Sequence, residues 1–139
     1  MELIPGFAIS GSALSAQKLR LDLIANNIAN INSTRTQEGG PYKRLMPVFE
    51  ERLREAAAGE FKGYGVKVSK IVKDPSSPRL EYNPEHPDAN AEGFVEMPNI
   101  NIVNEMVDMI TATRAYEANV TAFNTAKSMA LKALEIGNR

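Results

Sequence analysis

The stretch IVNEMVDMITATRAYEANVTAFNTAKSMALKALEI, residues 102–136, decides the fold of this chain. Apolar side chains recur at every third or fourth position along it, which is the spacing of one stripe on an α-helix. The stripe is narrow enough to be a coiled-coil seam. Only Thr113 and Lys127 in it are polar. Its positions are Ile102, Met106, Met109, Thr113, Tyr116, Val120, Phe123, Lys127, Ala130 and Leu134.

Both ends of this helix carry capping signals. Asn99 and Asn101 are candidate N-caps, Glu105 stands in an opening turn where the helix dipole favours negative charge, and Gly137 supplies a stop. At about 1.5 Å per residue the helix is about 50 Å long. A compact domain of this size does not need such a helix, so we expect its seam to pack against partners.

A second helix with heptad-like spacing is predicted over residues 7–31. Its apolar positions are Phe7, Leu14, Leu21, Ile24, Ile28 and Ile31. Near its end stand Asn26, Asn27 and Asn30, whose side chains compete for backbone hydrogen bonds and disfavour a helix interior. One interpretation is a fraying helix end rich in caps. The other is that these amides fix the register against a partner helix.

Most of the prolines and glycines fall between the two helices, which predicts a small β-rich insert. In the best strand, Val66, Val68 and Val72 share one face. Pro47 interrupts another strand candidate. The predicted elements are a loop over 33–41, a strand over 42–50, a short helical or irregular piece over 51–58, strands over 65–74, 79–82 and 93–97, and a loop over 83–91.

The predicted fold class is therefore mainly α with a small β-rich insert. An N-terminal helical segment (1–32) and a C-terminal helical segment (99–139) flank the loop and β-rich insert (33–98). Neither helix can bury its seam in so small an insert. We expect the two helices to pack as a coiled-coil-like pair, or against neighbouring copies.

Composition excludes several classes of protein. With a formal charge of −1 and no basic block, the 139-residue chain is not expected to bind nucleic acid. No run is apolar enough for a membrane span, and MELIPGF does not resemble a cleaved secretory signal. Cysteine is absent, which removes disulfides and thiolate chemistry. These features fit a cytosolic protein and equally one that is exported without a cleaved peptide.

No constellation of residues indicates catalysis. His86 lies between Glu85 and Pro87 in a polar loop, and the solvated interpretation outweighs a metal or general-base role. The adjacent carboxylates Glu50 and Glu51 are more typical of a surface than of a hydrolase pair. We predict no catalytic residue, no metal site and no cofactor.

Three stretches carry a resemblance to a known family. The run LIANNIANINS at 23–33, the following TRTQEGGPYKR and the segment 93–137 closely resemble the axial proteins of the bacterial flagellar rod and hook. The core TRAYEAN at 113–119 is similar to a serine-led motif of that family. The loop Gly39, Gly40, Pro41 and Tyr42 resembles the insertion found in proximal rod members. Residues 49–92 match only loosely.

The resemblance implies a structural subunit of the basal-body rod in the periplasmic space. Such proteins leave the cell unfolded through the flagellar type III export apparatus without cleavage. They then assemble helically with copies of themselves and other rod proteins around a central channel, and the shaft transmits torque. The implied assembly contacts are Leu14, Leu21, Ile24, Asn26, Asn27, Ile28, Asn30, Met106, Met109, Arg114, Tyr116, Asn119, Val120, Phe123 and Leu134.

Three rival functions stay open at this point. The first is another rod or hook subunit, which the Gly39–Tyr42 loop disfavours. The second is a cytosolic coiled-coil adaptor that binds a partner helix. The third is a peptidoglycan hydrolase that would use Glu85, His86 and Asp88.

Overall fold

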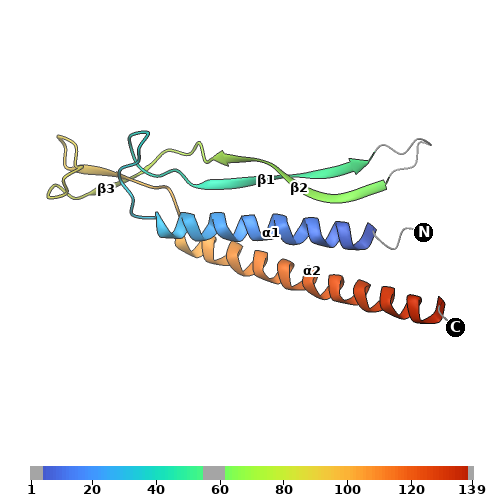
Figure 1. The fold of residues 1–139 in the computed structure, drawn as a ribbon. Coiled ribbons are helices and arrows are strands. Elements are labelled where there is room, and N and C mark those ends of the chain that lie inside the picture. Colours follow the sequence, from blue (N-terminus) through green and yellow to red (C-terminus); the bar gives the residue numbers. More distant parts are fainter. Residues whose placement is uncertain (1–4, 55–61, 138–139) are drawn as a thin grey trace.

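The computed structural model, which describes residues 5–54 and 62–137, contains two long helices with a small antiparallel strand region between them. The elements in chain order are α1 (Pro5–Ala29), β1 (Leu45–Arg54), β2 (Lys62–Lys73), β3 (Arg79–Tyr82), β4 (Phe94–Met97) and α2 (Ile102–Gly137). Figure 1 shows α1 and α2 side by side and antiparallel, with the β1–β2 hairpin along the other side of α1. The expected combination of two terminal helices and a β insert is confirmed.

Helix α2 begins and ends where its capping signals predicted. The Asn101 side chain accepts hydrogen bonds from the backbone N–H groups of Val103 (2.9 Å) and Asn104 (3.3 Å), so it is the N-cap. Gly137 is the last helical residue. Several hydroxyl side chains donate to the carbonyl four residues earlier, among them Thr113 to Met109 at 2.8 Å, which satisfies these groups within the helix.

Helix α1 ends at Ala29, two residues before the predicted end at Ile31. The asparagines that follow cap it, because the Asn30 amide donates to the Asn26 carbonyl at 2.9 Å and its oxygen accepts from the Ser33 hydroxyl at 3.0 Å. The cap interpretation is therefore confirmed for Asn30. Asn27 has a different role, described below.

The hairpin is longer than the sequence predicted. Residues 51–54 continue β1, so the helical or irregular piece expected there is wrong; residues 55–58 lie outside the described residues. β2 begins at Lys62 rather than at Gly65. Pro47 does not interrupt β1, because it stands in register opposite Ile71 in a two-stranded ribbon, where each strand has a free edge. The hairpin is extended by hydrogen-bonded pairing between β1 and β2, which the propensities of single segments cannot predict.

One glycine lets β2 approach α1 closely. Val66, Val68 and Val72 are half-buried, as their shared face predicted, whereas Lys67 is exposed. The Ser12 hydroxyl on α1 accepts a hydrogen bond from the Val66 N–H at 3.1 Å. Gly65 has a φ of +95°, and a Cβ built on it would lie 2.1 Å from the Ser12 Oγ. Only glycine fits at this contact.

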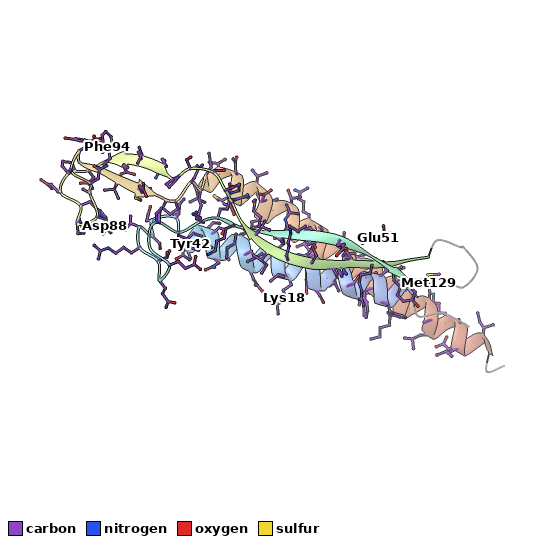
Figure 2. All side chains as sticks on the ribbon, turned by 90° about the horizontal axis from the view of Figure 1, so that it is seen from above. Lys18, Tyr42, Glu51, Asp88, Phe94 and Met129 are labelled. Atoms are coloured by element: carbon purple, nitrogen blue, oxygen red, sulfur yellow. The ribbon has the colours of Figure 1, made fainter. Side chains whose placement is uncertain are left out.

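The second strand pair, β3–β4, lies beyond the C-terminal end of α1 in both views (Figures 1 and 2). It is antiparallel, and the short strands predicted over 79–82 and 93–97 are confirmed, the second as Phe94–Met97. The rings of Tyr82 and Phe94 meet edge to face at 5.3 Å. Val95 is 2% exposed, so β4 contributes to the core although β3 is exposed throughout.

The buried apolar core is small for a chain of this length. Within the described residues it consists of Ala16, Leu23, Ile24, Val95, Ile100 and Ala112. Many large apolar side chains on α2 are instead exposed. A single chain thus leaves much of its apolar surface to be covered by other molecules.

We predict that Gly65→Ala destabilises the fold more than Gly40→Ala does. Both glycines have positive φ, which costs an alanine about 1 kcal/mol. The Gly40 position has open space, whereas Gly65 abuts Ser12, and overpacking there adds about 1–3 kcal/mol. Urea unfolding monitored by circular dichroism measures both free energies of unfolding. Equal losses would contradict the tight α1–β2 contact.

A polar junction and the candidate assembly surfaces

A buried carboxylate joins the two helices to the strand region. Glu105 on α2 is 1% exposed. One of its oxygens accepts a hydrogen bond from the Arg44 guanidinium, and the other accepts from the Asn27 amide on α1 at 3.2 Å. We call Arg20, Asn27, Tyr42, Arg44, Glu105 and Asp108 the polar junction. A buried charge is tolerated here because it is both paired and hydrogen-bonded.

Asn27 ties α1 to the start of β1. Its amide nitrogen donates to the Leu45 carbonyl at 2.9 Å, and its oxygen accepts from the Leu45 N–H at the same distance. The Tyr42 hydroxyl also donates to this oxygen, at 3.0 Å. Asn27 is 1% exposed, so all its polar atoms are satisfied inside the protein. The predicted amide hydrogen bond to a partner helix is present for Asn27, with α2 as that helix, and its role in fixing the register stays a prediction.

The outer edge of the junction is a shared ion pair. Asp108, one turn beyond Glu105, lies 3.1 Å from an Arg44 nitrogen and 3.4 Å from an Arg20 nitrogen. Arg44 therefore bridges two carboxylates on α2, and Arg20 brings in α1. Burial, and then the charge of Glu105, raise the pKa of Tyr42, which keeps its hydroxyl protonated as a donor to Asn27.

The loop Gly39, Gly40, Pro41 and Tyr42 belongs to this arrangement. Both glycines have positive φ, +85° and +76°, and the Tyr42 N–H donates to the Ser33 carbonyl at 2.9 Å to close the loop. Figure 2 shows Tyr42 beside the end of α1. The Asn26 amide also reaches the Tyr42 hydroxyl, at 3.3 Å. The loop thus delivers a side chain to the junction.

A second polar contact joins two loops at the β3–β4 end. The Asp88 carboxylate accepts a hydrogen bond from the Thr34 hydroxyl at 2.8 Å and pairs with the Arg35 guanidinium. These two interactions, in that order, hold the pKa of Asp88 below its usual value. The His86 ring nitrogen Nδ1 accepts from the Asp88 N–H at 3.1 Å. His86 and Asp88 therefore serve loop structure, and no group of three potential metal ligands occurs among the described residues.

An aromatic contact between the predicted stripes joins the two helices. The rings of Phe7 and Phe123 meet edge to face with centroids 5.0 Å apart. Ile24 is buried, and several other apolar stripe residues on the two helices are half-buried. These half-buried residues are Leu14, Leu21, Ile28, Met109, Tyr116, Val120 and Phe123.

The other predicted contact residues are placed differently. Met106 is 54% and Leu134 64% exposed, so neither is covered by α1. Arg114 is exposed, and the Asn119 amide donates to the Ala115 carbonyl of its own helix at 2.7 Å. Near the N-terminus of α2, the side that carries Glu105 and Ala112 is the buried one instead. Contacts of these residues with neighbouring subunits stay a prediction.

Sequence reasoning did not find the junction. From the sequence, Glu105 is expected only to interact with the helix dipole, and Arg44 belongs only to the stretch that carries the family resemblance. A usable signal existed, because Glu105 stands four and seven residues before Met109 and Ala112 and thus shares their side of α2. A single charge among inward-facing positions predicts a buried partner. Ser12 and Gly65 carried no such signal, since their contact depends on the folded approach of two elements.

Comparison with known proteins gives the same class of protein at both ends of the chain. A family model described as flagella basal body rod protein matches residues 7–35, and one described as flagellar basal body rod FlgEFG protein C-terminal matches residues 91–136. Two long terminal helices around a small β region, with exposed apolar surface, therefore belong to a flagellar rod protein.

Individual relatives identify the family more narrowly. The flagellar basal-body rod protein FlgC of Borreliella burgdorferi is 45% identical, with 98% of each chain covered. The FlgC proteins of Bacillus subtilis (46% identical, 93% and 94% covered) and Salmonella typhimurium (43% identical, 99% of each covered) are similar. This chain belongs to the FlgC family and is a structural subunit of the flagellar rod.

We predict that Glu105→Gln lowers the free energy of unfolding by about 3 kcal/mol, because Arg44 loses its buried counter-charge. That is the lower end for breaking a buried pair, since Asp108 still contacts Arg44. Glu50→Gln is the matched control: Glu50 and Lys67 are each more than half exposed, and the loss should stay below about 1 kcal/mol. Chemical denaturation measures the free energy of unfolding of both variants. Similar small losses for the two would show that the polar junction does not stabilise the fold.

The contact between the loops should open at low pH. The pKa of Asp88 is lower in the folded chain than in the unfolded one, so its contribution to stability is present above the unfolded value of about 4. It is lost as the pH falls through the lower folded pKa. Amide NMR shifts of residues 34–35 and 88 should therefore change in that acid window. The same step persisting unchanged in Asp88→Asn would assign it to other carboxylates.

Proposed function

We propose that this chain is a subunit of the proximal rod, assembling helically with copies of itself and with other rod proteins into a shaft that transmits torque. The observation that carries the proposal is the apolar surface left exposed on α2. Large apolar side chains along this helix are 46% to 77% exposed in the single chain. A helix with apolar residues on more than one face needs more than one neighbour.

The physical role of the polar junction in such a shaft is to hold the two helices in one register. Torque passes between subunits only if each subunit resists deformation. Buried and satisfied polar contacts such as Glu105–Arg44 and Asn27–Leu45 are directional, so they oppose sliding of α1 along α2. Coiled-coil-like packing between neighbouring subunits, using the half-buried stripe residues, is part of this proposal.

Export without cleavage through the flagellar type III apparatus is a further part of the proposal. It rests on the family resemblance. The small apolar core supports it, because a chain with few buried side chains loses little stabilising free energy when it unfolds for passage through the apparatus. Neither helix, within the described residues, contains a stretch that is long and apolar enough to cross a membrane. We place the assembled subunit in the periplasmic part of the basal body.

The proposed role is structural and not catalytic. Relatives over nearly the full length are named as rod proteins, which supports this. Another position in the rod or hook is the alternative within the class. The resemblance of the Gly39–Tyr42 loop to the insertion of proximal rod members supports the proximal position. A cytosolic adaptor would leave flagellar assembly unaffected.

Deletion of the gene in its own organism, followed by imaging of basal bodies, tests the function. If the membrane ring persists while rod and hook are missing, the chain acts in the proximal rod. If rods and hooks form normally, the proposal is wrong and the cytosolic adaptor becomes the favoured function.

We predict that Phe123→Asp abolishes swimming in soft agar. The new carboxylate would replace a half-buried ring that packs on Phe7, and an unpaired charge that is partly removed from water is unfavourable there. Leu21→Asp should act in the same way from α1. Thr121→Asp, at an exposed position of the same helix, is the control and should swim normally. Immunoblots confirm that each variant is present. Normal swimming of Phe123→Asp would contradict the assignment of Phe123 to the seam between the helices.

A further inference from the structure

The β3–β4 pair and the loop that joins its strands stand apart from the other elements. We call residues 79–97 the lobe, which comprises β3, β4 and the loop 83–93 between them. No Cα atom of β3 or β4 lies within 8 Å of α1, α2, β1 or β2 in the described structure. Figure 2 shows Asp88 and Phe94 of the lobe at the end of the molecule opposite to Met129.

The loop of the lobe is held by interactions within the lobe itself. The side-chain oxygen of Asn90 accepts hydrogen bonds from the backbone N–H groups of Glu92 and Phe94, both at 2.9 Å. The Phe94 ring in turn packs edge to face on Tyr82, so β3, β4 and the loop contact one another. We therefore expect the lobe to move as one body.

The base of the lobe, where β4 leads into α2, is anchored by buried apolar side chains. Val95 is 2% and Ile100 6% exposed, and Pro98 between them is fully buried. The N-cap of α2, Asn101, follows directly. Moving the base would expose these apolar side chains to water, which is unfavourable. The base is therefore the fixed end of the lobe.

The loop of the lobe is joined to the rest of the chain by one carboxylate. Asp88 accepts a hydrogen bond from the Thr34 hydroxyl at 2.8 Å and pairs with the Arg35 guanidinium, and we call this contact the latch. Among the described residues, no other hydrogen bond or ion pair links the lobe to a residue outside it. The side chain of Arg35 is 75% exposed and that of Asp88 19%. An ion pair with one exposed partner is weak, so the latch can open and close reversibly.

The other side of the latch is fixed to α1. Thr34 follows Ser33, whose hydroxyl donates to the side-chain oxygen of Asn30 at 3.0 Å. The Ser33 carbonyl accepts from the Tyr42 N–H at 2.9 Å, which ties this segment to the polar junction as well. Because these bonds hold the segment in place, opening the latch releases the lobe and not the segment that receives it.

We propose that the Asp88 latch sets the orientation of the lobe. With the latch closed, the lobe is fixed relative to α1; with the latch open, it pivots as one body about its buried base. Strand β3 is exposed throughout, with Leu80 60% and Tyr82 67% exposed, so the latch decides where this apolar surface points. The inference goes beyond the proposed rod function and does not depend on it.

Spin labels test the latch in the purified full chain, because the sequence contains no cysteine of its own. Labels on Lys18→Cys in α1 and Glu85→Cys in the lobe report the orientation of the lobe, and labels on Glu85→Cys and Glu96→Cys report its internal structure; all three positions are exposed. We expect Asp88→Ala to broaden and shift the Lys18–Glu85 distance distribution, measured by pulsed electron paramagnetic resonance. The Glu85–Glu96 distribution should not change. Glu92→Ala, which removes an exposed carboxylate from the same loop, is the matched control and should change neither distribution.

Two other outcomes would overturn the proposal. An unchanged Lys18–Glu85 distribution in Asp88→Ala would show that the buried base alone fixes the lobe. Broadening of both distributions would show that the loop loses its structure instead of pivoting with the lobe. Circular dichroism checks that each variant keeps its helix content. If Asp88→Ala does not, Thr34→Val combined with Arg35→Ala removes both donors from the other side of the latch, and an unchanged orientation of the lobe in that variant counts against the proposal.

Discussion

The hydrogen-bonded ion pair of Glu105 with Arg44, completed by Asn27, is the constraint on which the rest of the structure depends. It is the point where α1, α2 and the start of β1 meet, and Glu105 and Asn27 are both 1% exposed there. Apolar stripes on two helices can slide by a turn with little loss. A buried carboxylate cannot, because it would lose its partners and remain desolvated. The junction therefore selects one alignment of the helix pair.

This alignment explains why the subunit is incomplete by itself. Once Asn27 and Glu105 are opposed, α1 begins near Phe123 and the last turns of α2 continue past it. The hairpin occupies the other side of α1, held by the Ser12–Val66 hydrogen bond, so it cannot cover α2. Helix α1 is thus enclosed from two sides while α2 is covered along one. The surface that a rod subunit needs for its neighbours follows from how the chain packs internally.

The loop of residues 39–42 connects the family identity with this geometry. In the sequence it resembles the insertion of proximal rod members. In the structure its positive-φ glycines turn the chain back so that the Tyr42 hydroxyl reaches Asn27. Burial raises the pKa of that hydroxyl. The loop is therefore part of the contact that joins the two helices.

The sequence by itself determined the two helices, an asparagine N-cap at Asn99 or Asn101, the faces of β2 and the family, because helical and strand periods and capping residues are local signals. It did not reveal that residues 51–54 continue β1, that Gly65 must clear Ser12, or which side of α2 faces inward near Glu105. Those features depend on contacts between separate elements, such as the pairing of β1 with β2 and the contacts of Asn27 with Leu45 and Glu105, which lie 18 and 78 positions away. Only the tertiary structure decided them, because the burial of a charge depends on which partners the whole fold brings to it.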